Sequence, residues 1–295
     1  WWLMWFIVDA CGLVCMMITY GLLSGSNLAV VKFGWWAFFK EPLIPVLKLL
    51  YELWFIFAIW SHLACMLTDP GAVPLNVEAS EGERQCSKCK TVKPPKAHHC
   101  SICNRCIMKM DHHCPWVNNC VGARNQKHFV LFLVYVQLQC YAAVFLLGAQ
   151  FMHSTTPHRP RHRHKAFLAK SQPYITEEDR LIYAESENWA HSKAAQEARM
   201  EHAKDPFQQQ LEDDGKIVAC ILVFFVAIVF GLFTTIMLCD QVSNIVSGQT
   251  GIDQLKKESE TKTRPWRESM QEVMGRGPSW RWLVPIPLRR GQVKD

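Results

Sequence analysis

Four stretches of the chain are apolar over a length that can cross a membrane. A hydrocarbon core about 30 Å thick takes roughly 20 residues of helix. Polar stretches occupy residues 68–128, 153–216 and 240–295, and the apolar stretches lie at 1–23, 43–67, 129–152 and 217–239. The pattern predicts an all-α polytopic membrane protein with four transmembrane helices and the lipid bilayer as a partner.

Two smaller features belong to the first two spans, which with their connection make up residues 1–67. Asp9 is an acid inside the first span, where it is either functional or close enough to the chain end to reach water. The aromatic segment at 31–42 contains a Lys near each end. We expect it to be a short interfacial loop at the membrane surface.

The distribution of charge predicts the orientation of the helices. Four spans place both chain ends and the 68–128 loop on one side of the membrane. That loop has 9 Lys and Arg against 5 Asp and Glu, and the 240–295 tail has 10 against 7. The positive-inside rule therefore favours the cytosol for both. The 153–216 loop is long enough to translocate regardless of its charge, and we expect it to be lumenal.

A dense group of cysteines and histidines lies in the loop between the second and third spans. Seven of the 13 cysteines fall between Cys86 and Cys120. Cys-x-x-Cys spacings in a chain that is not a small secreted domain indicate metal binding rather than disulfides. Thiolate ligands require a reducing compartment, which agrees independently with a cytosolic position for this loop.

The group contains a repeated pattern, C-x2-C-x9-H-x6-C, which occurs twice with a displacement of 14 residues. Each copy supplies three thiolates and one imidazole, the closed tetrahedral ligand set of structural zinc. The sequence therefore predicts two structural Zn²⁺ ions. The predicted ligands of the first are Cys86, Cys89, His99 and Cys106, and those of the second are Cys100, Cys103, His113 and Cys120.

One cysteine of this group has no place in the repeat. A third copy beginning at Cys114 would need ligands at Val117, Lys127 and Val134, and none of these residues can complete a zinc site. Asp111 and His112 precede this thiol and also have no structural assignment. An acid, an imidazole and a thiol in this order fit nucleophilic catalysis by an activated cysteine. The alternative is a spare thiol without function.

The residues 111–116, DHHCPW, together with the preceding cysteines, resemble the DHHC-type protein S-acyltransferases, or palmitoyltransferases. The likeness covers Cys86 to Phe129 almost continuously. It also includes Asp69-Pro70-Gly71 after the second span, and Gly122 and Asn125 before the third.

The resemblance implies a small cytosolic zinc-bound cysteine-rich domain between helices 2 and 3, at residues 68–128, and a reaction in two steps. Cys114 would take a fatty acyl group, expected to be palmitoyl, from the co-substrate acyl-CoA as a thioester. It would then pass this group to a cysteine of a membrane-associated protein. By the same likeness His112 is the general base, and Asp111 orients it. We expect a Golgi or endoplasmic reticulum membrane, or alternatively the plasma membrane, with the active site facing the cytosol.

Three residues of the cysteine-rich domain align with positions that this family uses toward CoA. They are Lys93, Lys96 and His98. A basic face resting on anionic lipid is an equally open interpretation. The acyl chain would need an apolar cavity between the helices, which the polar residues Gln137, Gln139 and Thr235 could shape or cap.

The sequence departs from the family after the fourth span. The usual Thr-Thr-x-Glu motif reads Thr250-Gly251-Ile252-Asp253 here, so the second Thr, which is expected to help hold the active-site acid, is absent.

Other classes of function fit less well. The formal charge of +6 over 295 residues is too weak to suggest a nucleic-acid protein. A metal transporter would need intramembrane acids and histidines that converge, and Asp9, Glu52 and His62 form no obvious site. The main alternative to an acyltransferase is a membrane-anchored zinc-binding interaction module without catalysis, which would tolerate the loss of Cys114.

Overall fold

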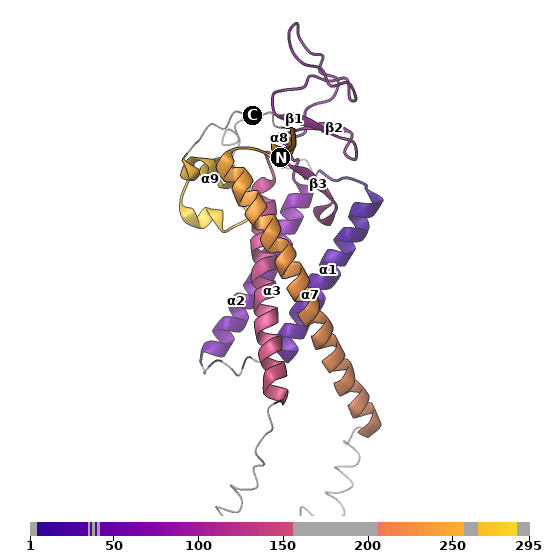
Figure 1. Ribbon diagram of the computed structural model, residues 1–295, viewed down its shortest axis with the longest axis vertical. Helices are drawn as coiled ribbons and strands as arrows, with labels where there is room; N and C mark the ends of the chain where they lie inside the picture. Colours follow the sequence, from indigo (N-terminus) through magenta and orange to yellow (C-terminus); the bar gives the residue numbers. More distant parts are fainter. Residues whose placement is uncertain are drawn as a thin grey trace, which may run out of the picture. The chain divides into compact units, whose positions relative to one another are not determined.

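The computed structural model describes residues 5–34, 36, 39, 42–155, 206–256 and 265–287 (Figure 1). The chain divides into two compact units. One comprises Trp1–Ala149 and Val223–Asp295, and the other comprises Gln150–Leu222. The second unit contains the described ends of two long helices, and most of the loop predicted at 153–216 lies outside the described residues. All the sites discussed below belong to the first unit.

Four helices are long and apolar enough to cross a membrane, as the sequence predicts. In the most apolar 18-residue stretch of α3, 56% of the residues are buried inside the protein. In the corresponding stretches of the other three helices the share is 11–17%. The protein therefore encloses α3 most, while the others present apolar side chains such as Met17 and Ile236 to the lipid. The four helices are α1 (Ala10–Phe33), α2 (Leu43–Leu67), α3 (Gln126–Thr155) and α7 (Pro206–Ser247).

The limits of α1 and α7 differ from the predicted spans for identifiable reasons. Asp9 is the N-cap of α1, and its carboxylate accepts the Gly12 N–H at 2.8 Å. The helix therefore starts after this residue and continues to Phe33, beyond the predicted range of 1–23. α7 extends past the predicted end at 239 because Gln241 and Asn244 have buried hydrogen-bond partners.

The cysteine-rich segment between α2 and α3 folds into two antiparallel β-hairpins. In each hairpin the histidine of the repeat lies opposite the last cysteine of the same repeat: His99 faces Cys106, and His113 faces Cys120. A short 3₁₀ helix follows the third strand. The elements are β1 (Ala97–Cys100), β2 (Arg105–Met108), β3 (His112–Cys114), η2 (Pro115–Val117) and β4 (Asn119–Val121).

A tight turn after α2 attaches the first hairpin to the membrane helices. The carboxylate of Asp69 accepts the N–H groups of Gly71 at 2.9 Å and Ala72 at 2.7 Å. Gly71 has φ +104°, a left-handed conformation in which a side chain would be strained. Its carbonyl then accepts the Met108 N–H of β2 at 2.8 Å. This geometry explains why the Asp-Pro-Gly sequence follows α2.

Two buried asparagines attach the second hairpin to the last turn of α2. Nδ2 of Asn119 lies 3.0–3.1 Å from the carbonyl oxygens of Cys65, Met66 and Thr68. Nδ2 of Asn125 also reaches the Cys65 carbonyl, at 3.2 Å. The last carbonyls of a helix have no partner within it, so these amides satisfy groups that would otherwise be buried and unpaired.

Three short elements follow α7, and the last of them contacts α3. The buried ammonium of Lys127 donates to the carbonyls of Arg281 at 2.9 Å and Ile286 at 3.0 Å. The Tyr135 hydroxyl donates to the Leu283 carbonyl. The elements are α8 (Gly251–Lys256), α9 (Trp266–Met274) and η3 (Ser279–Trp282).

Candidate active site and metal centres

The first predicted zinc unit forms one compact cluster. Its members are Cys86, Cys89, His99 and Cys106, and their ligand atoms all lie within 4.8 Å of one another. Sγ of Cys86 is 3.6 Å from Nδ1 of His99, and Sγ of Cys89 is 3.7 Å from Sγ of Cys106. Four tetrahedral ligands at the usual Zn–S and Zn–N bond lengths lie about 3.6–3.8 Å apart. The cluster therefore has the donor set and the size that zinc requires.

The second unit has the same form. Nδ1 of His113 lies 3.5–3.7 Å from the sulfurs of Cys100, Cys103 and Cys120, and the last two sulfurs are 3.5 Å apart. The Cys103 N–H points at the Cys100 sulfur at 3.4 Å. Backbone donors of this kind stabilise a thiolate, so the local turn favours the metal-binding state of the cysteines.

Cys114 belongs to neither cluster. It is the last residue of β3 and the N-cap of η2, and it is 6% exposed. Nδ1 of His113 points into the second cluster, whereas its neighbours His112 and Cys114 belong to neither cluster.

Asp111 is a buried carboxylate with four hydrogen-bond donors. Oδ2 accepts from Nδ1 of His112 at 2.7 Å and from Nε2 of Gln241 at 2.8 Å. Oδ1 accepts from the Gly251 N–H at 2.8 Å and from Nδ2 of Asn244 at 3.1 Å. Burial raises the pKa of Asp111, but these hydrogen bonds outweigh burial and lower the pKa below its usual value. The group is therefore held as a carboxylate.

Gly251 occupies the position at which the family motif has its second Thr. Its backbone N–H reaches the carboxylate directly, and a Cβ at this position would lie 3.3 Å from Oδ1 of Asp111. Thr250 and Asp253 form a reciprocal pair across the first turn of α8, with N–H to side-chain distances of 3.2 and 3.1 Å. The motif variant thus keeps a contact with the acid, through the backbone instead of a hydroxyl.

His112 has two nitrogens in different surroundings. Nδ1 bonds to Asp111, whereas Nε2 is buried and has no hydrogen-bond partner among the described residues. Burial lowers the pKa of His112, but the hydrogen bond to Asp111 and the nearby Cys114 sulfur raise it to about 9. A carboxylate that accepts from Nδ1 fixes the tautomer, so Nε2 is the nitrogen that can exchange a proton.

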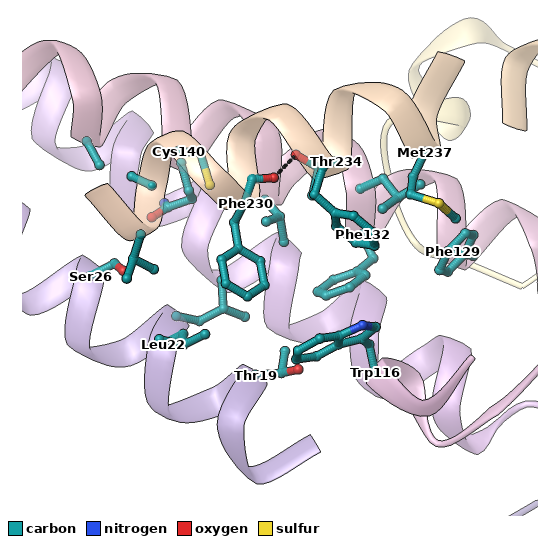
Figure 2. A pocket seen from close by; sticks show the side chains of 18 of the residues that line it. Thr19, Leu22, Ser26, Trp116, Phe129, Phe132, Cys140, Phe230, Thr234 and Met237 are labelled. Carbon is teal, nitrogen blue, oxygen red and sulfur yellow. Dashed lines mark hydrogen bonds between the residues drawn. The ribbon is translucent and has the colours of Figure 1, made fainter. Parts of the chain in front are cut away.

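An apolar cavity opens beside this group. Cys114 and Trp116 line it together with residues of α1, α3 and α7, among them Phe132 and Phe230 (Figure 2). Two threonines in its wall direct their hydroxyl groups to carbonyls of their own helices. Thr234 donates to the Phe230 carbonyl at 2.8 Å, and Thr19 donates to the Cys15 carbonyl at 2.9 Å. The lining of the cavity is therefore mostly apolar.

The polar residues expected to shape the cavity divide into two groups. Gln139 lines the cavity, but its amide donates to the Tyr51 carbonyl at 2.8 Å. Gln137 and Thr235 are not among the lining residues and bond to each other at 2.9 Å.

The three residues expected to face CoA lie around β1. His98 is buried, and its Nε2 is 3.3 Å from Oδ1 of Asp253. Nζ of Lys96 donates to the Gly248 carbonyl at 3.5 Å from an exposed position, and Lys93 is partly exposed. The placement of His98 beside Asp253 connects the first hairpin to α8.

The hydrogen-bond partners of Asp111 are the part of the site that the sequence analysis missed. Gln241 and Asn244 are three residues apart, which places them on one face of a helix. Two amides on one face directly after an apolar span are a signal for a buried polar contact. Hydrophobicity alone places the end of the fourth span at residue 239, so both amides fall in the polar tail that follows it.

Comparisons with known proteins agree with this geometry. Residues 79–258 match the family model described as DHHC palmitoyltransferase. The palmitoyltransferase ZDHHC3 of Rattus norvegicus is 33% identical over 297 residues, which cover 96% of this chain and 83% of the relative. The palmitoyltransferase ZDHHC7 of Mus musculus is 34% identical over 315 residues, covering 98% and 84%. The palmitoyltransferase PFA4 of Debaryomyces hansenii is 40% identical over 129 residues, covering 43% and 32%.

The family match spans both metal clusters, the Asp111–His112–Cys114 group and α8, and the two mammalian relatives extend it over nearly the whole chain. An interaction module without catalysis is therefore the weaker interpretation. The chain belongs to the DHHC palmitoyltransferase family, and it is an integral membrane protein with protein S-acyltransferase function.

Proposed function

We propose that Cys114 is the acyl carrier of this enzyme. It takes a fatty acyl group, such as palmitoyl, from acyl-CoA as a thioester and transfers the group to a cysteine of a membrane-associated protein. The observation that carries this proposal is the position of Cys114. It lies outside both metal clusters, follows the Asp111–His112 pair, and lines the wall of an apolar cavity.

Each half of the reaction needs one proton acceptor. In the first half, the proton of the Cys114 thiol resides on Nε2 of His112, which the raised pKa of about 9 favours, and the thiolate attacks the acyl carbonyl of acyl-CoA. The CoA thiolate leaves and takes the proton back from His112. In the second half, His112 accepts the proton of the acceptor cysteine, whose thiolate attacks the thioester. Cys114 leaves as a thiolate and is protonated by His112.

Asp111 supports both halves without itself changing protonation. Its bond to Nδ1 keeps Nε2 of His112 available and stabilises the imidazolium that forms each time a proton is taken. The other three donors to this carboxylate keep it ionised and fixed in place.

The apolar cavity is the proposed seat of the acyl chain. Burial of each methylene group contributes about 0.8 kcal/mol, so a long chain gains most of its binding energy there. A cavity wall with few free polar atoms suits hydrocarbon and excludes the water that would hydrolyse the thioester.

Two structural Zn²⁺ ions complete the proposed site. The eight cluster residues would hold them, and the metals would fix the hairpins that carry His112 and Cys114. We further expect the cysteine-rich domain to face the cytosol in a Golgi, endoplasmic reticulum or plasma membrane. Lys93, Lys96 and His98 remain candidates for contact with CoA phosphates, beside the alternative of anionic lipid.

Loading of the purified enzyme with radiolabelled palmitoyl-CoA tests this proposal. We expect Cys114→Ser to abolish the covalent label while the protein keeps about two zinc ions per chain. Cys239→Ser is a matched control, because Cys239 is an exposed thiol outside the clusters and the cavity. It should load like the wild type. Full loading of Cys114→Ser would place the nucleophile elsewhere.

A further inference from the structure

His62 is a fully buried imidazole in α2 with a hydrogen-bond partner on each nitrogen. It is 0% exposed, and it lies within the membrane-spanning part of the helix. Nε2 is 2.9 Å from the carbonyl oxygen of Trp116 in η2, and Nδ1 is 2.8 Å from the hydroxyl of Tyr20 in α1. Ionisable residues in such surroundings are costly and usually have a role.

The Trp116 carbonyl determines the tautomer of His62, and the Tyr20 hydroxyl complements it. A backbone carbonyl can only accept a hydrogen bond, so Nε2 must carry the proton and donate it to Trp116. In the neutral ring Nδ1 is then an acceptor, and the Tyr20 hydroxyl donates to it. Tyr20 thus satisfies the nitrogen that is left unprotonated when His62 binds the carbonyl of η2.

Two aromatic rings hold the imidazole plane in place. The Tyr20 ring meets it edge-on at a centroid distance of 4.9 Å, and the Phe132 ring of α3 does so at 5.1 Å. His62 therefore contacts side chains of α1 and α3 and the backbone of η2. It connects these three elements at one buried point.

His62 bonds to η2, the 3₁₀ helix that begins directly after Cys114. This cysteine is the N-cap of η2, and Trp116 is the second residue after it. Trp116 and Phe132 both line the cavity (Figure 2). The Trp116 ring also meets Phe230 edge-on at 5.7 Å. A shift of η2 would therefore move the reacting sulfur and the cavity wall together.

We propose that His62 is a positioning residue, which holds η2 through the Trp116 carbonyl and so places Cys114 against the acyl carbonyl in the cavity. This inference rests on the proposed role of Cys114. Small displacements of a reacting group can cost up to about 100-fold in rate. We therefore expect the replacement of His62 to slow acyl loading. The metal clusters, of which His62 is not a member, should stay intact.

Two substitutions separate the contact with η2 from the contact with α1. His62→Gln places an amide nitrogen near the position of Nε2 and can still donate to Trp116. His62→Asn is shorter, reaches only the region of Nδ1, and loses the Trp116 bond. Tyr20→Phe keeps the ring contact and removes the hydroxyl that bonds to Nδ1. Leu63→Ala, at a lipid-exposed neighbouring position, is the control.

The experiment measures single-turnover loading by palmitoyl-CoA, over a range of concentrations, together with zinc content and thermal stability. We expect His62→Asn to lower the maximal loading rate at least about tenfold, with half-saturation changed less than the rate and about two zinc ions retained. His62→Gln should recover most of the rate. Tyr20→Phe should give a smaller loss than His62→Asn, and Leu63→Ala none.

Equal loading by His62→Gln and His62→Asn, at the wild-type rate or at the same reduced rate, would overturn the inference. Parallel loss of rate, zinc and thermal stability in both variants, with Tyr20→Phe like the wild type, would also overturn it. Cys114→Ser, assayed in parallel, distinguishes this failure from failure of the proposed function. If that variant still loads, the acyl carrier is another residue. If it does not load, only the role of His62 has failed.

Discussion

At the residue scale, Asp111 illustrates how a buried charge is maintained. It is 7% exposed and accepts four hydrogen bonds, three of which come from residues more than 100 positions away in the sequence. Burial of an unpaired carboxylate would be strongly unfavourable. The donors from α7 and α8 remove this cost and orient the carboxylate toward His112 at the same time.

Gln241→Met tests the contribution of one of these donors. Methionine has a similar shape but no N–H, so Asp111 loses one hydrogen bond while the packing is largely kept. A hydrogen bond to a charged group contributes about 1.5–3 kcal/mol, and we expect acyl loading to slow about tenfold or more. Val242→Ala, at a partly exposed neighbouring position, should load normally. Wild-type loading by Gln241→Met would show that this amide does not support the acid.

Gly251 is the residue at which this chain departs from the family motif. Because its N–H already reaches Oδ1 of Asp111, a threonine hydroxyl is not required for this contact. A side chain here would come to 3.3 Å from Oδ1, which is closer than most Cβ contacts. The variant motif is therefore compatible with a working acid.

At the scale of elements, the two β-hairpins connect metal binding to the reactive group. β3 contains His112, His113 and Cys114 in succession, and its pairing with β4 places His113 opposite Cys120. One three-residue strand thus carries a predicted base, a predicted metal ligand and the proposed nucleophile. Loss of the metal would free the strand that positions the other two.

Variants within this strand should separate structural from chemical roles. Replacing the cluster residues Cys103 or His113 removes a zinc ligand, and we expect loss of zinc, loss of acyl loading and faster proteolysis of the 86–120 segment. His112→Gln should also lower loading, but with about two zinc ions retained and unchanged proteolysis. Zinc measured by mass spectrometry decides between the two patterns. Equal zinc loss in all three variants would contradict this division of roles.

At the scale of the whole molecule, we expect the four spans to place both tails and the cysteine-rich domain on one side of the membrane. We expect epitopes in the 68–128 loop and the 240–295 tail to be accessible from the cytosol, and an epitope in the 153–216 loop to be protected. Protease protection in sealed microsomes measures this directly. A protected cysteine-rich domain would contradict the orientation.

The sequence was most informative where its pattern was local and repeated. The two C-x2-C-x9-H-x6-C units name the same eight residues that the structure groups into two clusters, and Cys114 falls outside both in sequence and in space. Four apolar blocks were sufficient to predict four membrane helices. Local spacing carries this information because metal ligands and spans depend on short segments.

Contacts between distant segments could not be predicted in the same way. Asn244 lies 133 residues from Asp111, and His62 lies 54 residues from Trp116. His62 and Gln241 are single polar residues in or next to apolar helices, and only the packing of helices against the hairpins gives them partners. Hydrophobicity alone also placed the start of α1 too early, because it ignored the capping role of Asp9.

Site-resolved mass spectrometry of the enzyme after brief incubation with palmitoyl-CoA tests the central claim most directly. The account predicts a hydroxylamine-sensitive acyl group on Cys114, with the cysteines of both clusters unmodified. An acyl group on any other cysteine, with Cys114 unmodified, would contradict it.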